Sequence, residues 1–266
     1  MNAFSSIIHE DSNNFHAFIP PSNQIYGGDQ ITFRLSMKKA SYQISEEIGK
    51  CNFFSILEKT GKLRQNIAIE ANTLYANKFG NLRNPNRHYD DRIATPLNGA
   101  YSSMISPLMQ INENDLFMNW ETYAKKEEGG GRTGFRVGVD KNSQSIELSR
   151  YILYPGSRTI AHTYPENLGL TLQQCEFLYN NLVKLNSNID SELIDKTLAR
   201  LHWWFIQATP YFRGTASCGE IISSAITHHK YGKLIEWEQD VHVDHIALVS
   251  SEEEFVSIYP HLYKLN

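Results

Sequence analysis

The chain has 266 residues, of which 41% are hydrophobic and 12% aromatic, and this composition is typical of a folded globular protein rather than a disordered one. Its formal net charge of −4 provides no overall attraction to a phosphate backbone, so we expect no nucleic-acid partner. No apolar run has the length of a membrane-spanning segment, and three unevenly spaced cysteines indicate neither a disulfide framework nor a cysteine-based zinc site.

The N-terminal part of the chain is rich in breakers of regular structure. Residues 1–38 contain many Asn, Ser, Pro and Gly residues, which predicts a mostly irregular arm. Its beginning, Ser5 to Asn14, has the composition of a flexible secretion leader and lacks the features of a Sec signal. No shift in composition marks a boundary after this arm, so residues 39–266 are expected to form a single domain.

Apolar spacing predicts helices before the middle of the chain. One helix is expected from about Tyr42 to Leu63 and a second from Gln65 to Phe79, followed by a polar loop from Gly80 to Asp91. A further helix is expected after Pro96, and Pro107 should kink or end it.

The period then changes from that of a helix to that of a strand. Gly129 to Gly131 is expected to be a flexible hinge. Residues Gly134 to Val139 alternate like a strand, and Ser145 to Tyr154 can return as its partner. This β-hairpin is the only clear β unit expected before the C-terminal half.

Helices are expected to follow the hairpin. Thr171 with Gln174 fits a capping box for a helix that ends near Leu185, and another helix begins at Asp190 or Ser191 and ends at Pro210.

The C-terminal part of the chain contains two further signals for the start of a helix. Ser217 with Glu220 fits a capping box for one helix, and Ser250 with Glu253 fits one for the final helix, after a short strand at Ile246–Val249. The pattern as a whole predicts a mainly α (α+β) protein with a small β flap.

The most informative stretch is Leu201 to Ser217, with the sequence LHWWFIQATPYFRGTAS. A helix stops at Pro210, and Arg213 stands beside the start of the next helix. Unpaired N–H groups at a helix start and an adjacent guanidinium suit an anion, above all a phosphate or diphosphate. The alternative is that Arg213 only pairs with a nearby carboxylate. His202 and the two tryptophans are expected to be buried scaffold.

This stretch resembles the AvrB family of avirulence proteins, type III effectors of plant pathogens that carry His-Trp-Trp, a proline and then Arg-Gly-Ser/Thr-Ala. Thr215 stands where serine is usual. The likeness continues through residues 243–248 and 251–259, and short upstream segments near Thr95 and His162 match as well. The resemblance implies a bilobal Fido architecture, shared with Fic proteins: a helical lower lobe and a small upper lobe that contains the β-hairpin.

The same resemblance implies a function. AvrB-like proteins are expected to move a deoxysugar such as rhamnose from a nucleotide diphosphate donor, dTDP- or UDP-rhamnose, to a threonine or serine of an immune-regulatory host protein. Asp244 is the first choice of base, and His162 would orient the sugar and the acceptor hydroxyl. A plain helix or turn cap is the other interpretation of Asp244. The residues expected to bind the donor are Arg213, Gly214, Thr215, Thr95 and Tyr101.

Other functions stay open at this point. A Fic-type AMP transferase would need a histidine where Thr209 stands, together with a Gly-Asn-Gly-Arg cradle that the chain lacks. A non-catalytic effector could instead bind a host peptide along the 134–154 hairpin edge. His242 to His245 resembles metal-ligand spacing, but no second cluster completes it, and no metal is predicted. Asn2 replaces the glycine that N-myristoylation requires, so we expect a secreted effector that acts inside the host cell without that anchor.

Overall fold

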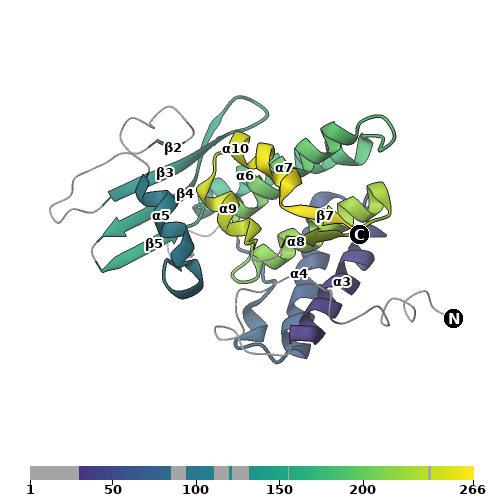
Figure 1. Ribbon diagram of the computed structural model, residues 1–266, viewed down its shortest axis with the longest axis horizontal. Coiled ribbons are helices and arrows are strands. Elements are labelled where there is room, and N and C mark those ends of the chain that lie inside the picture. Colours follow the sequence, from purple (N-terminus) through teal and green to yellow (C-terminus); the bar gives the residue numbers. More distant parts are fainter. Residues whose placement is uncertain (1–29, 85–93, 111–119, 122–131, 155, 239–240) are drawn as a thin grey trace.

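Helices make up most of the residues that the computed structural model describes, and an antiparallel sheet lies at one end of them (Figure 1). The described residues are 30–84, 94–110, 120–121, 132–154, 156–238 and 241–266. The predicted mainly α (α+β) class is confirmed. The relation to Fido proteins and the single domain over 39–266 stay predictions.

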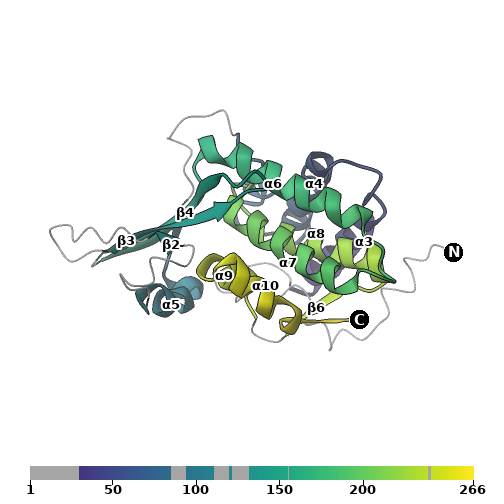
Figure 2. The same ribbon diagram turned by 90° about the horizontal axis from the view of Figure 1, so that it is seen from above.

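The helical body is built around α7 (Ser191–Ala208), whose C-terminal half is almost wholly buried. Trp203, Trp204 and Phe205 are among its buried side chains, as predicted for a scaffold. This helix packs against four others. They are α6 (Pro165–Lys184), α8 (Thr215–Tyr231), α9 (Val243–Val249) and α10 (Glu252–Ile258). On the far side of α8 lie α3 (Gln30–Ser45) and α4 (Phe53–Glu70) (Figure 2).

The predicted β-hairpin is present and belongs to a larger sheet. Its strands are β3 (Arg132–Val139) and β4 (Ser145–Tyr154). The Asp140 carboxylate accepts the N–H groups of Asn142 and Gln144 and so fixes the turn. The full order is β1-β5-β4-β3-β2, with every pair antiparallel. The added strands are β1 (Ala94–Pro96), β2 (Trp120–Glu121) and β5 (Ser157–Ala161).

Short elements complete the chain. After β1 come η3 (Gly99–Met104) and α5 (Ile105–Gln110), and near the C-terminus β6 (Ile235–Trp237) pairs with β7 (Tyr263–Leu265). The 3-10 turns η1 (Ala76–Lys78) and η5 (Tyr259–His261) follow α4 and α10.

The predicted boundaries of the first helices are wrong. The chain is already helical from Gln30, inside the segment expected to be irregular, and it breaks at 46–52, inside the first predicted helix. Asn52 accounts for the second start, because its side chain accepts the N–H of Ser55 as an N-cap. Residues 1–29 and the glycine hinge at 129–131 lie outside the described residues.

Two prolines act at helix starts rather than at helix ends. Pro107 lies in the first turn of α5, where a missing N–H costs no hydrogen bond. Pro165 is the first residue of α6, so the predicted capping box at Thr171 is wrong. The Thr171 hydroxyl instead donates to the Asn167 carbonyl inside the helix, and Gln174 accepts the N–H of Lys141.

Three C-terminal predictions also need correction. Residues 246–249, expected as a strand, belong to the helix α9. The capping box of the final helix is Ser251 with Glu254, one residue later than predicted. The N-cap of α8 is Gly214, so Ser217 lies inside the helix, where its hydroxyl donates to the Gly214 carbonyl.

Candidate functional site

The turn that carries Arg213 is held in place by a distant segment of the chain. The Arg83 and Phe212 N–H groups donate to the carbonyls of Pro210 and Asn81. The Gly80 N–H donates to the Arg213 carbonyl at 3.0 Å. Residues 80–83 were predicted to be a polar loop, and they instead run as a short antiparallel partner of residues 210–213. The backbone of residues 210–213 is therefore held by hydrogen bonds to residues 80–83, which are distant in the sequence.

The Arg83 side chain also holds this turn in place. Its guanidinium is buried and donates to the carbonyls of Ala208 and Thr209, each at 3.1 Å, and of Thr163 at 2.6 Å. The first two carbonyls belong to the C-terminal end of α7, where a cation is favoured by the helix dipole. Arg83 thus joins α7 to the chain that follows β5.

The N-terminus of α8 is a compact polar corner. Gly214 adopts φ +85°, a left-handed conformation that suits glycine, and it has no side chain to cap the helix. A Cβ atom there would lie 2.9 Å from the Phe79 ring and 3.2 Å from Arg64 Cγ. The Arg64 Nε donates to the Ser217 hydroxyl at 2.6 Å. A second arginine, from α4, therefore lies against this helix start.

Arg213 is partly exposed beside this corner. Its guanidinium carbon lies 5.3 Å from the centre of the Tyr75 ring. Within the described part of the chain no carboxylate forms an ion pair with it, so the alternative of a pairing with a nearby carboxylate has no support there. The observed partner is an aromatic face, which leaves the charge able to take an anion.

Asp244 lies in the first turn of α9, directly after the N-cap His242 and Val243. A carboxylate at this place is favoured by the helix dipole, and its Oδ2 lies 3.9 Å from His245 Nε2. Burial raises the pKa of Glu220 well above its usual range, the Asp244 carboxylate raises it further, and Arg64 opposes both. The acid of α9 and the start of α8 are therefore electrostatically linked through Glu220.

His162 and Thr95 are brought together as predicted members of one site. The Thr95 hydroxyl lies 2.7 Å from His162 Nε2, because Thr95 belongs to β1, and β1 pairs with β5, which ends directly before His162. The other ring nitrogen, Nδ1, lies 2.9 Å from the hydroxyl of Thr209 at the end of α7. His162 thus connects β1 to the residue that precedes Pro210.

Tyr101, in η3, packs against the helix that carries Asp244. Its ring centre is 4.9 Å from that of His245, and the Ser103 hydroxyl lies 3.4 Å from His245 Nδ1. Burial lowers the pKa of His245, and the Asp244 carboxylate opposes this shift. Tyr101 therefore contacts the residue that directly follows Asp244 in the chain.

Cys175, Cys218 and His202 are buried in surroundings that favour a structural role over a catalytic one. Burial raises the pKa of the Cys175 thiol and raises that of Cys218 to about 12, so neither thiol is a nucleophile near neutral pH. Burial lowers the pKa of His202 to about 3, and its Nδ1 lies within hydrogen-bonding distance of the Ser223 and Tyr259 hydroxyls. In the described ranges, no group of three or more His, Cys, Asp or Glu side chains is arranged to hold a metal ion.

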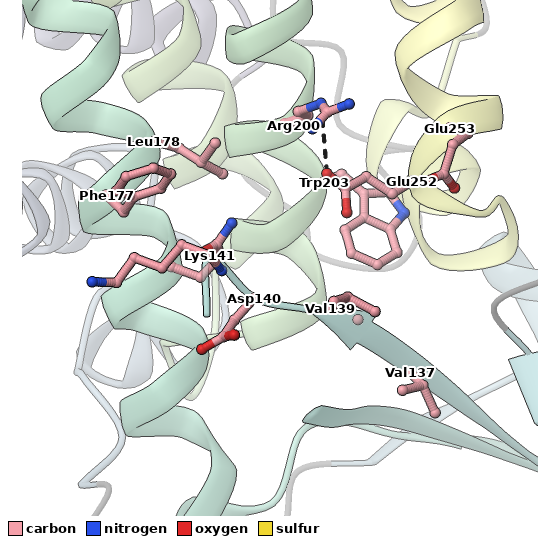
Figure 3. A pocket seen from close by; sticks show the side chains of 12 residues that line it. Val137, Val139, Asp140, Lys141, Phe177, Leu178, Arg200, Trp203, Glu252 and Glu253 are labelled. Carbon is pink, nitrogen blue, oxygen red and sulfur yellow. Dashed lines mark hydrogen bonds and ion pairs between the residues drawn. The ribbon is translucent and has the colours of Figure 1, made fainter. Parts of the chain in front are cut away.

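A cavity of about 250 Å³ lies elsewhere, between the end of β3, α6, α7 and α10 (Figure 3). None of the predicted site residues lines it. Several of its charged side chains have partners within the chain: Arg200 Nε lies 3.7 Å from Glu252 Oε1, Asp140 holds the hairpin turn, and Lys141 lies over the Phe177 ring.

Sequence reasoning missed Arg64, Arg83, Glu220 and Thr209. Each reaches the site from a different element, and only Glu220 had a local signal, which pointed to a helix cap instead. A buried arginine has no spacing rule of its own, so its role becomes visible only when its partners are placed.

Fold and site together define a helical protein with a small antiparallel sheet and a helix start flanked by two arginines, Arg64 and Arg213. Residues 139–266 match the model of the AvrB_AvrC family, described as "Avirulence protein", and this match supports a relation to the avirulence effectors. No curated protein matches the chain significantly. Among the described helices, none combines the length and apolar character needed to cross a membrane.

Proposed function

We propose that the protein is a secreted effector that transfers a deoxysugar, such as rhamnose, from a nucleotide diphosphate donor to a threonine or serine of a host protein. The observation that carries this proposal is the start of α8, where Arg213 and Arg64 flank a glycine-capped helix in the segment that matches the avirulence family. Backbone N–H groups and guanidinium groups together suit a diphosphate and would stabilise the charge that develops as it leaves.

The acidic and hydroxylic side chains supply the other half of the reaction. The charge of Asp244 acts on Glu220 of α8, which supports a role for this acid near the α8 corner, and as a base it would take the proton of the acceptor hydroxyl. In the balanced step, the acceptor oxygen bonds to the sugar carbon, the bond from that carbon to the diphosphate breaks, and the diphosphate keeps the electron pair. Thr95, His162 and Tyr101 would surround the sugar and the acceptor.

The test is donor binding and transfer with a matched pair of variants. Arg213→Ala should abolish binding of dTDP- or UDP-rhamnose and shift the melting temperature by no more than about 2 °C, since Arg213 has no ion pair in the described chain to lose. Arg200→Ala removes a partly exposed arginine away from the site and is the control. Binding is measured by calorimetry and transfer by the mass of a threonine-containing acceptor protein.

Other results would redirect the proposal. Binding of ATP alone would favour nucleotidyl transfer. No binding of any nucleotide sugar, together with capture of a host peptide, would favour a non-catalytic effector. That peptide would not pair along the whole hairpin edge as predicted, because β5 already pairs with β4 over residues 150–154.

A further inference from the structure

Thr209 has a backbone conformation that its side chain disfavours. It lies directly after α7 with φ 44° and ψ 63°, in the left-handed region. Helices commonly end in this conformation with glycine, whereas a β-branched residue is strained there. Thr209 is also buried, so contact with solvent does not explain the choice of a hydroxyl. A strained polar side chain at such a position requires a specific partner.

The partners of its hydroxyl are the Ile206 carbonyl at 2.8 Å and His162 Nδ1 at 2.9 Å. A hydroxyl has one proton to donate and a carbonyl has none. The Thr209 proton therefore goes to the Ile206 carbonyl, and the bond to the ring must be donated by Nδ1–H. In a neutral imidazole the other nitrogen, Nε2, is then an acceptor.

This assignment also determines the direction of the hydrogen bond between His162 and Thr95. His162 Nε2 accepts its bond from the Thr95 hydroxyl at 2.7 Å. The Thr95 proton is thus used on the ring, and the Thr95 oxygen keeps its lone pairs for a group that donates. Such a group is a hydroxyl of the sugar or of the acceptor residue, because the oxygens of a diphosphate have no proton to give.

We infer that Thr209 is a positioning residue that holds His162 in its Nδ1–H form, so that Thr95 presents a hydrogen-bond acceptor to a substrate hydroxyl. The catalytic consequence rests on the proposed function, whereas the state of the ring does not. Among the residues expected to bind the donor, Thr95 then belongs to the sugar and acceptor side of the site rather than to the diphosphate side.

The direct test is nitrogen NMR of the full chain with labelled histidine, since protonated and unprotonated ring nitrogens resonate far apart. The His162 signals are assigned by their loss in His162→Gln. We expect Nδ1 to carry the proton in the wild type and in Thr209→Ser, and Nε2 to carry it, wholly or in part, in Thr209→Val. A wild-type ring with the proton on Nε2, or an unchanged ring in Thr209→Val, would overturn the inference.

Thr209→Gly separates positioning from structure. Glycine removes the strain, so the melting temperature should stay equal or rise while the Nδ1–H preference is lost. A preference that survives in Thr209→Gly would also count against the inference. This variant serves the same purpose if Thr209→Val does not fold.

Transfer kinetics add the link to function. With a nucleotide sugar, Thr209→Val and Thr209→Gly should lower kcat on the order of 10²-fold with little change in donor KM, and Thr209→Ser should restore it. If the wild type transfers no sugar, the proposed function fails, yet the NMR result still decides whether Thr209 sets the tautomer. An unchanged kcat in an otherwise active protein would remove the positioning role.

Discussion

At the scale of single residues, burial distinguishes arginines that have a structural role from arginines that do not, a difference that the residue type alone does not show. Arg64 and Arg83 are buried and hold the candidate site, whereas Arg158 is exposed. The charge of each is identical, and only its partners differ. Burying a charge is costly unless it is hydrogen-bonded, so these two arginines define positions where substitution should be most damaging.

Glu252 should make stability depend on pH. Burial raises its pKa from 4.5 to about 7, and the Trp204 indole N–H donates to it at 3.1 Å. The folded state binds more protons than the unfolded state between these pKa values, so the free energy of unfolding should fall as pH rises from 4.5 to about 7, by at most about 3 kcal/mol.

Glu252→Gln keeps an acceptor for Trp204 and removes the titration. Urea unfolding at several pH values should show a smaller slope in this variant, with the largest gain in stability above pH 7. Glu58→Gln, at an exposed position, controls for the loss of one negative charge. Equal slopes for Glu252→Gln and the wild type would show that Glu252 does not titrate in this range.

At the scale of elements, strong local signals were read correctly and weak ones were not. The hairpin from Gly134 to Tyr154 and the helix that ends before Pro210 were predicted, because alternation and apolar spacing are regular there. The break between α3 and α4 was missed, since Ile48 keeps the helical spacing that begins at Ile44. The α9 helix was mistaken for a strand because seven residues are too few to show a period.

Arg83 should determine how α7 ends. Arg83→Lys keeps the charge but cannot reproduce the fork that reaches three carbonyl groups, so the free energy of unfolding should fall by about 3 kcal/mol. Arg158→Lys, at an exposed position in β5, is the matched control. Denaturant unfolding measures both, and a change below about 0.5 kcal/mol for Arg83→Lys would be too small for a buried anchor.

At the scale of the whole molecule, the sheet is joined to the helical body through α6 and α7. Gly138 of β3 lies against Trp204, and a Cβ atom there would come within 2.5 Å of Trp204 Cη2 and 2.9 Å of Leu148 Cδ1. The glycine is thus required by a close approach between sheet and helix. The same region begins the segment that matches the avirulence family, residues 139–266.

Gly138→Ala should loosen this joint. Overpacking against a fully buried tryptophan is expected to lower the free energy of unfolding by about 1–3 kcal/mol. Tryptophan fluorescence should report the displacement of Trp204. Val139→Ala changes the exposed neighbour and serves as control. If Gly138→Ala is as stable as the wild type, the sheet and α7 do not pack as tightly as described.

The sequence by itself determined the helical class, the hairpin, the buried His-Trp-Trp scaffold and the likeness to avirulence proteins, because these depend on local periodicity and on a contiguous motif. It also named His162 and Thr95 as partners in one site by resemblance. Only the tertiary structure decided that Thr209 holds His162, that Arg64 lies on Ser217, and that residues 80–83 pair with the motif turn. These contacts join residues far apart in the chain, and a hydrogen bond between distant segments leaves no pattern in the order of the amino acids.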